Sequence, residues 1–175
     1  MAVRNIEKDD SYFLHKESRP VAFPLSDTVK EVIQDLKDTM DTRPSATGLA
    51  APQIGSNVQV FVYKCRQQTP VTVMINPRIV KAADFEATPK MEMCLSYPSR
   101  IYSVPRYKRI AVHFQDENGD VYVLKYRGFE ARILQHEIDH LHGLTIADKG
   151  AKIDEETTKT LLGEDYDKTE YEKDK

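Results

Sequence analysis

The chain has 175 residues, enough for one domain with a sizeable core. An apolar fraction of 40% and a charged fraction of 30% are typical of globular proteins, and a net charge of −3 gives no strong attraction to nucleic acid or anionic membranes. No apolar run approaches the ~20 residues of a membrane span, and the first ten residues resemble neither a secretory signal nor a transit peptide, so we expect a cytoplasmic location.

The first predicted element is an amphipathic helix over residues 25–41. Apolar residues recur there with the 3.6-residue period of a helix, and Ser26 and Asp27 are candidate N-caps. We interpret this apolar stripe as a surface that packs on the core. A glycine-bounded loop, residues 48–55, follows it.

Strands are predicted next, over residues 58–63, 71–75 and 78–80, and again over residues 110–114 and 121–126. The last two flank a loop that contains Asn118-Gly119, a pair typical of a hairpin turn. A second helix is predicted over residues 129–142, and Gly143 is expected to end it in the left-handed conformation. Strands followed by one late helix favour an α+β domain over a doubly wound sheet.

The chain becomes polar and acidic near its end. Residues 151–175 contain five lysines and nine acidic residues, a net charge of −4. We therefore divide the chain into a catalytic domain, residues 1–150, and an acidic C-terminal tail, residues 151–175. A short helix around Leu161 and Leu162 is expected within the tail, and its last dozen residues have the composition of a disordered segment.

The second predicted helix carries the motif His136-Glu137-Ile138-Asp139-His140, which matches H-E-x-x-H. Residues four apart lie above one another on the same face of a helix, so both imidazoles can reach one metal ion. Glu137 is displaced by 100° around the helix axis, where it can meet a water on the metal without binding the metal. The motif therefore predicts two ligands and a base.

Apolar residues lie on both sides of this helix, which indicates that it is buried. Phe129 and Ile133 share the face of the two histidines, while a second face carries Leu134, Ile138 and Leu141. Buried histidines need partners, which a metal or hydrogen bonds can provide.

A catalytic metal site uses three protein ligands and keeps one position open. The metzincin pattern H-E-x-x-H-x-x-G-x-x-H fails here because its last position is Ile146. Glu156 and Glu164 are alternatives, but they lie in the acidic tail, a poor scaffold for a rigid site. Cys94 is the strongest candidate, since its thiolate is a good ligand for zinc and iron.

The other cysteine and histidines receive structural interpretations. Two cysteines are too few for a disulfide scaffold, and Cys65 is interpreted as a small core residue. His15 and His142 are expected on the surface. His113 is the remaining ring that could supply the fourth ligand of a purely structural zinc site, and its place in a strand favours the core or a cross-strand contact.

Three blocks of sequence stand in a fixed order: residues 48–55 (GLAAPQIG), 92–96 (EMCLS) and 135–143 (QHEIDHLHG). In this order and at these separations they resemble the three signature motifs of the peptide deformylase family. The resemblance covers roughly residues 3–147 and leaves the acidic tail uncovered.

The resemblance implies a metal held by Cys94, His136 and His140, with Glu137 as general acid/base. The expected fold is α+β, with antiparallel strands packed around a central metal-binding helix and an N-terminal amphipathic helix. The implied activity is the removal of the formyl group from formyl-methionine at the start of nascent polypeptides, by metal-bound hydroxide.

The resemblance also implies roles around the metal. The Gln53 side chain and the Leu95 backbone N–H would form the oxyanion hole, and Glu92 would support a metal ligand. Gly48 would let the substrate backbone approach closely. Among residues that would contact the substrate we place Gly48 and Met93.

Phe129 and Ile133 are candidates for packing the methionine side chain, although they could equally be plain core residues. Three positions depart from the family. Ala46 and Met93 stand where the family usually has glycine, and Ile101 stands where some members have a substrate-contacting arginine.

One divalent metal per chain is implied: Fe²⁺ in the cell, with Zn²⁺, Ni²⁺ or Co²⁺ as alternatives. The expected partners are N-formyl-methionyl nascent peptides, with weak or no ribosome docking through the acidic tail, no specific nucleic acid, no membrane, and a monomeric chain. Two rival interpretations stay open at this point, a general metallopeptidase and a structural zinc site in a binding module.

Overall fold

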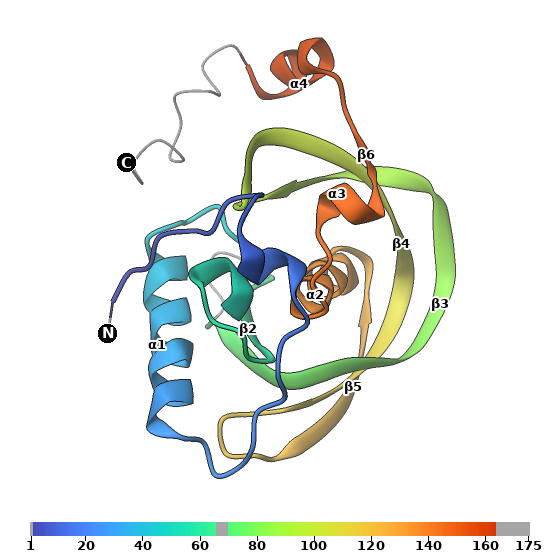
Figure 1. Cartoon of the computed structure of the whole chain (residues 1–175). Helices are drawn as coiled ribbons and strands as arrows, with labels where there is room; N and C mark the ends of the chain where they lie inside the picture. Colours follow the sequence, from blue (N-terminus) through green and yellow to red (C-terminus); the bar gives the residue numbers. More distant parts are fainter. Residues whose placement is uncertain (1, 66–69, 164–175) are drawn as a thin grey trace.

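The structure is a computed structural model that describes residues 2–65 and 70–163. An antiparallel sheet curls around one helix, α2 (Gly128–Leu141), while α1 (Asp27–Asp41) lies apart from α2, beside the start of the sheet (Figure 1). The expected α+β fold is confirmed. None of the described helices has the length and apolar character needed to cross a membrane.

The sheet follows the chain order almost throughout. Its neighbouring strands are β1 (Gly48–Ala50), β2 (Val60–Tyr63), β3 (Thr72–Cys94), β4 (Tyr97–Gln115) and β5 (Val121–Arg127), all antiparallel. A short strand, β6 (Ala151–Lys152), pairs with β4. The short helical elements are η1 (Tyr12–His15), η2 (Ala51–Ile54), α3 (Ile146–Lys149) and α4 (Glu155–Leu162).

Strand β2 lies between the two main helices and is buried throughout. Phe61 and Tyr63 belong to the core cluster that includes residues of α2, whereas Val60 and Val62 belong to the cluster that includes residues of α1. Alternate residues of a strand point to opposite faces, so one short apolar strand fixes both helices. The predicted α1 is confirmed, with Ser26 as its N-cap accepting from the Val29 N–H at 3.3 Å.

The sequence prediction was wrong about the length of two strands. The segments predicted at 71–75 and 78–80 are one strand, β3, and the segment predicted at 110–114 is the end of β4. Residues 81–91 of β3 and 107–109 of β4 are largely exposed and lack apolar alternation, so the pairing of β3 with β4, not periodicity, makes the strands continuous there. Pro77 and Pro89 lie within register shifts, where a missing N–H is tolerated.

The N-terminal segment closes over the C-terminal end of α2. Ser18 N–H donates to the Leu141 carbonyl at 2.8 Å, and Glu17 forms a β-bridge with His142. Gly143 has φ +70°, as predicted, and a Cβ there would lie 2.9 Å from backbone atoms of His15 and Lys16. The start of the chain thus packs directly against the last turn of the central helix.

The predicted acidic tail begins with ordered elements. Strand β6 pairs with β4, and α4 is the short helix expected around Leu161 and Leu162. The prediction of disorder falls on residues 164–175, which lie outside the described residues.

Candidate metal centre

Three side chains from two distant segments converge at the end of β3. Cys94 is near the β3–β4 turn, and His136 and His140 lie one turn apart on α2. One potential ligand atom from each lies within 4.8 Å of the other two, and Cys94 Sγ is 3.3 Å from His140 Nε2. Within residues 2–65 and 70–163 this is the one group of three or more such side chains that is suited to hold a metal ion.

The donors fit a catalytic transition metal. One thiol and two imidazoles suit zinc or iron, and three protein ligands leave a coordination position open. His113 is half-buried in β4 and pairs across the sheet with Arg78 and Val123, so among the described side chains it offers no fourth ligand. His15 and His142 are exposed, as expected. This arrangement does not favour the structural zinc site.

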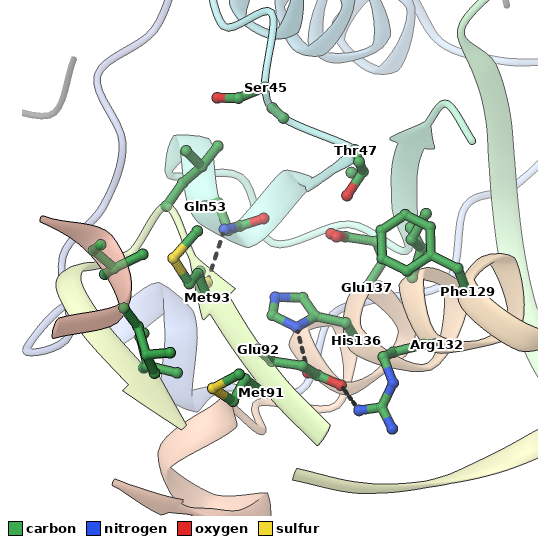
Figure 2. Close-up of a pocket in the computed structure, with 18 residues that line it drawn as sticks. Ser45, Thr47, Gln53, Met91, Glu92, Met93, Phe129, Arg132, His136 and Glu137 are labelled. Atoms are coloured by element: carbon green, nitrogen blue, oxygen red, sulfur yellow. Dashed lines mark hydrogen bonds and ion pairs between the residues drawn. The ribbon is translucent and has the colours of Figure 1, made fainter. Parts of the chain in front are cut away.

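Glu92 orients one of the potential ligand histidines. Its Oε2 lies 3.0 Å from His136 Nδ1 (Figure 2), which leaves Nε2 of that ring available to bind a metal. Arg106 binds both Glu92 oxygens, at 2.9 and 2.8 Å, and Arg132 binds Oε1 at 2.6 Å. Burial alone would raise the pKa of Glu92, but the hydrogen bonds from Arg106 and His136 hold it well below its usual range. Glu92 therefore stays a carboxylate that can accept the His136 N–H.

Arg106 joins this carboxylate to the motif helix. Its guanidinium also pairs with Asp139, which lies between His136 and His140 in sequence. Removing one partner of such a buried cluster is costly, because the remaining charges lose their compensation. The cluster therefore fixes α2 relative to the end of β3.

Glu137 is buried beside the three potential ligands but belongs to no ligand group. Its Oε2 has no hydrogen-bond partner among the described residues. Burial raises the pKa of Glu137 to about 7. A carboxyl group that changes charge near neutrality is suited to accept and release a proton.

Gln53 lies on the opposite side of the site, at the end of η2. Its Oε1 accepts from the Ala50 N–H at 2.9 Å, so its amide N–H₂ group is directed towards Cys94 Sγ and Ser96 Oγ, at 3.5 and 3.3 Å. The fixed oxygen sets the orientation of the amide. Gln53 is thus held as a donor beside the potential metal ligands.

A cavity of about 460 Å³ opens onto these groups. Figure 2 shows Gln53, Glu137 and His136 between Met93 on one side and Phe129 on the other. Ile133 lines the buried part, and Phe129 is largely exposed at the edge. Both candidates for packing an apolar substrate side chain therefore line the cavity.

Comparisons with known proteins agree with this geometry. The sequence pattern of the polypeptide deformylase family matches residues 3–156, and "Peptide deformylase 1" of Clostridium perfringens is 37% identical over 148 residues, 85% of this chain and 98% of that one. The chain belongs to the polypeptide deformylase family. "Peptide deformylase 1" of Bacillus cereus is 40% identical over 129 residues, 73% of this chain and 81% of that one.

Solved deformylase structures share the fold. The peptide deformylase from Thermotoga maritima has a TM-score of 0.78 at 31% identity and covers 86% of this chain and 99% of its own. That from Legionella pneumophila also has a TM-score of 0.78, at 30% identity, and covers 95% of each chain. As a deformylase, this chain is a metal-dependent hydrolase that removes the N-formyl group from nascent peptides.

The residues that depart from the family motifs do not strain the backbone of this deformylase. Neither Ala46 nor Met93 is among the residues with positive φ, so neither position needs glycine for its backbone. Both line the cavity, as does Ile101, which is buried. The three side chains make the cavity more apolar than glycine and arginine would.

Sequence reasoning missed several residues of the deformylase site. The sequence patterns assigned no role to Arg106, Arg132 or Ser96. The two leucines of α4, Leu161 and Leu162, also line the cavity although they belong to the predicted tail. Of these residues, only Arg132 could have been placed near the site from the sequence. It precedes His136 by four residues and therefore lies on the same face of the helix.

Glycine is needed at position 48 because a side chain there would collide with Glu137, not because the backbone has an unusual conformation. A Cβ at this position would lie 2.6 Å from Glu137 Cδ. We predict that Gly48→Ala displaces the Glu137 carboxylate, lowers deformylase activity by about ten- to a hundredfold and destabilises the fold.

The check is a double-mutant cycle on thermal unfolding with Glu137→Ala. That second change removes the atoms that the new Cβ meets, so Gly48→Ala should lower Tm less in the Glu137→Ala background. Equal losses of Tm in both backgrounds would show that Glu137 does not define the space at Gly48.

Proposed function

We propose that Cys94, His136 and His140 bind one divalent metal, and that Glu137 acts as the general acid/base of deformylation. The observation that carries this proposal is the convergence of the three potential ligands beside a buried carboxylate that ligates nothing. When bound, the metal supplies an activated water and polarises the formyl carbonyl.

The chain's own residues bind and orient the substrate. In the proposed arrangement the methionine side chain enters the buried part of the cavity, against Ile133, with Phe129 at its edge. This position excludes water from one side of the formyl group. The amide N–H₂ of Gln53 and the backbone N–H of Leu95 donate to the formyl oxygen as negative charge develops on it.

Glu137 moves the protons in this proposal. Its carboxylate accepts a proton from the attacking water and then delivers it to the leaving amine of methionine, so formate and a free amino terminus are produced. Gly48 leaves the space that Glu137 occupies, and Glu92 holds His136 in the required orientation.

The experiment is a formate-release assay with formyl-Met-Ala-Ser on protein purified without oxygen, combined with metal analysis. We expect formate release that requires one bound metal per chain and stops after chelation. An absence of release with each of Fe²⁺, Zn²⁺, Ni²⁺ and Co²⁺ would overturn the proposal.

Fe²⁺ is the metal we propose for the cell, because a ferrous ion accepts both thiolate and imidazole ligands. We also propose that the chain acts as a monomer in the cytoplasm, where translation supplies formylated nascent chains. The division into a catalytic domain, residues 1–150, and an acidic tail, residues 151–175, stays a prediction.

We propose that the acidic end of the chain provides no ribosome docking. Acidic side chains are repelled by RNA phosphates and release no counterions from them. Deleting residues 164–175 should leave deformylation of short peptides unchanged, and ribosome affinity in sedimentation assays should stay equal or rise, most visibly at low salt. A loss of ribosome affinity on truncation would identify these residues as a docking element.

A further inference from the structure

The end of helix α4 contributes to the cavity from beyond the family match, which ends at residue 156. Leu161 and Leu162, at the C-terminal end of α4, line the same cavity as His136 and Glu137. The cavity is thus completed, on this side, by residues that lie outside the part of the chain matched by the family pattern.

The position of α4 is fixed by several contacts. Asp154 caps its N-terminus, accepting from the Thr157 N–H at 2.8 Å, and Thr158 is buried. Just before the helix, the Ile153 N–H donates to the Ile101 carbonyl at 2.9 Å, and β6 pairs with β4. Because Ile101 itself lines the cavity, the chain is anchored directly beside the cavity before α4 begins.

The cavity has a buried inner part and a half-exposed apolar rim. Ile133, on the face of the ligand histidines, is only 5% exposed, whereas Met91, Met93 and Leu161 are 54%, 46% and 48% exposed. Met91 and Met93 are two residues apart on β3 and so point to the same side of the strand. Large apolar side chains gathered at the mouth of a pocket indicate a surface that a ligand covers.

We infer that this rim, formed by Leu161 and Leu162 of α4 and by Met91 and Met93 of β3, binds the side chain of the residue that follows formyl-methionine. The inference rests on the proposed function, which places the methionine side chain in the inner part of the cavity. The next residue of the peptide then lies outside this inner part, at the exposed mouth of the cavity, where the rim lies.

The chemistry of the rim defines its preference. It has four apolar side chains, so it favours apolar over charged residues at the second position of the peptide. Methionine side chains are flexible and adapt to ligands of different shape, so the preference is broad within the apolar residues. Half of the rim stays in contact with water, so we expect the preference for Leu over Asp or Lys to be about three- to tenfold in kcat/KM.

The test compares Leu161→Lys with Thr160→Lys on formyl-Met-X-Ser peptides in which X is Leu, Ala, Asp or Lys. Thr160 is the adjacent residue of α4, is exposed and does not line the cavity, so it receives the same charge outside the rim. For Leu161→Lys we expect a lower kcat/KM with the X = Leu peptide than the unmodified protein has. We also expect the ratio of kcat/KM for X = Asp to that for X = Lys to rise, because the new positive charge attracts Asp and repels Lys. The change should appear in KM, with kcat nearly constant. Thr160→Lys should keep the preferences of the unmodified protein.

A second variant, Leu161→Ala with Leu162→Ala, reduces the rim without adding charge and should bring the Leu/Asp ratio towards one. Metal content and thermal unfolding are measured for every variant, and Leu161 is exposed enough for Leu161→Lys to fold. If the unmodified protein, Leu161→Lys and Thr160→Lys had equal preferences among the four peptides, the inferred role of the rim would be refuted. The proposed function would remain intact. Formate release from none of the four peptides by the unmodified protein would refute the proposed function, and the rim with it.

Discussion

Replacing Glu137 with Gln should lower kcat/KM for formyl-Met-Ala-Ser by at least about 100-fold and leave the metal content at one per chain. Gln has the size of Glu and fills the same space beside Gly48, but its amide cannot accept the proton of the attacking water. Glu137 is also not a member of the potential ligand group, so the metal should stay. Formate release and elemental analysis of the same sample measure both quantities.

Glu130→Gln is the matched control. Glu130 is on the same helix and is half-buried, but it lies outside the cavity beside the metal centre and its Oε1 accepts from the Tyr63 hydroxyl. This variant should keep nearly full activity. If Glu137→Gln instead lost its metal, Glu137 would be a ligand, and the acid/base would have to be found elsewhere.

Replacing Cys94 with Ser should remove most of the bound metal, and activity with it. The serine hydroxyl is not deprotonated at neutral pH and is a much weaker ligand for zinc or iron than a thiolate. The two histidines remain, so the helix should fold and bind metal only weakly. The measurement is metal content after dialysis, with circular dichroism to follow the fold.

Cys65→Ser serves as the control, because Cys65 is half-buried and takes no part in the potential ligand group. It should retain one metal per chain. Unchanged metal content in Cys94→Ser would show that Cys94 is not a ligand, and Glu156 and Glu164 would then be tested as alternative ligands.

Local patterns predicted the elements whose residues interact at short separations. The helix with His136 and His140, its end at Gly143 and the apolar stripe of α1 each depend on neighbours within one or two turns, and the structure has all three. The Asn118-Gly119 hairpin is similar, since Gly119 N–H donates to the Asp116 carbonyl within one turn. Such features can be read from the sequence because few residues decide them.

The long strands could not be predicted in this way. In β3, Glu86 pairs with Arg106 of β4 although neither residue is apolar and twenty positions separate them. Partner strands stabilise such polar segments through backbone hydrogen bonds, which leave no periodic signal in the side chains.

The site was predicted where motifs existed and was incomplete where only the fold brings residues together. Cys94 was found through its motif, and Glu92 likewise, whereas the contact of Arg132 with Glu92 spans forty positions. The presence of Leu161 beside the cavity depends on the pairing of β6 with β4, which follows from no local pattern. Charge and polarity alone therefore gave no indication that Leu161 and Leu162 line the cavity.

The closure of the N-terminal segment over α2 determines when a newly made copy of this protein can become complete. Ser18 donates to the carbonyl of Leu141, which follows it by 123 positions, and the close contact at Gly143 involves His15 and Lys16. These contacts of residues 15–18 cannot form until the central helix has also been synthesised. Contacts of such long sequence separation form late and slowly. An enzyme that acts on the beginnings of other nascent chains must therefore wait for its own central helix before residues 15–18 can close over it.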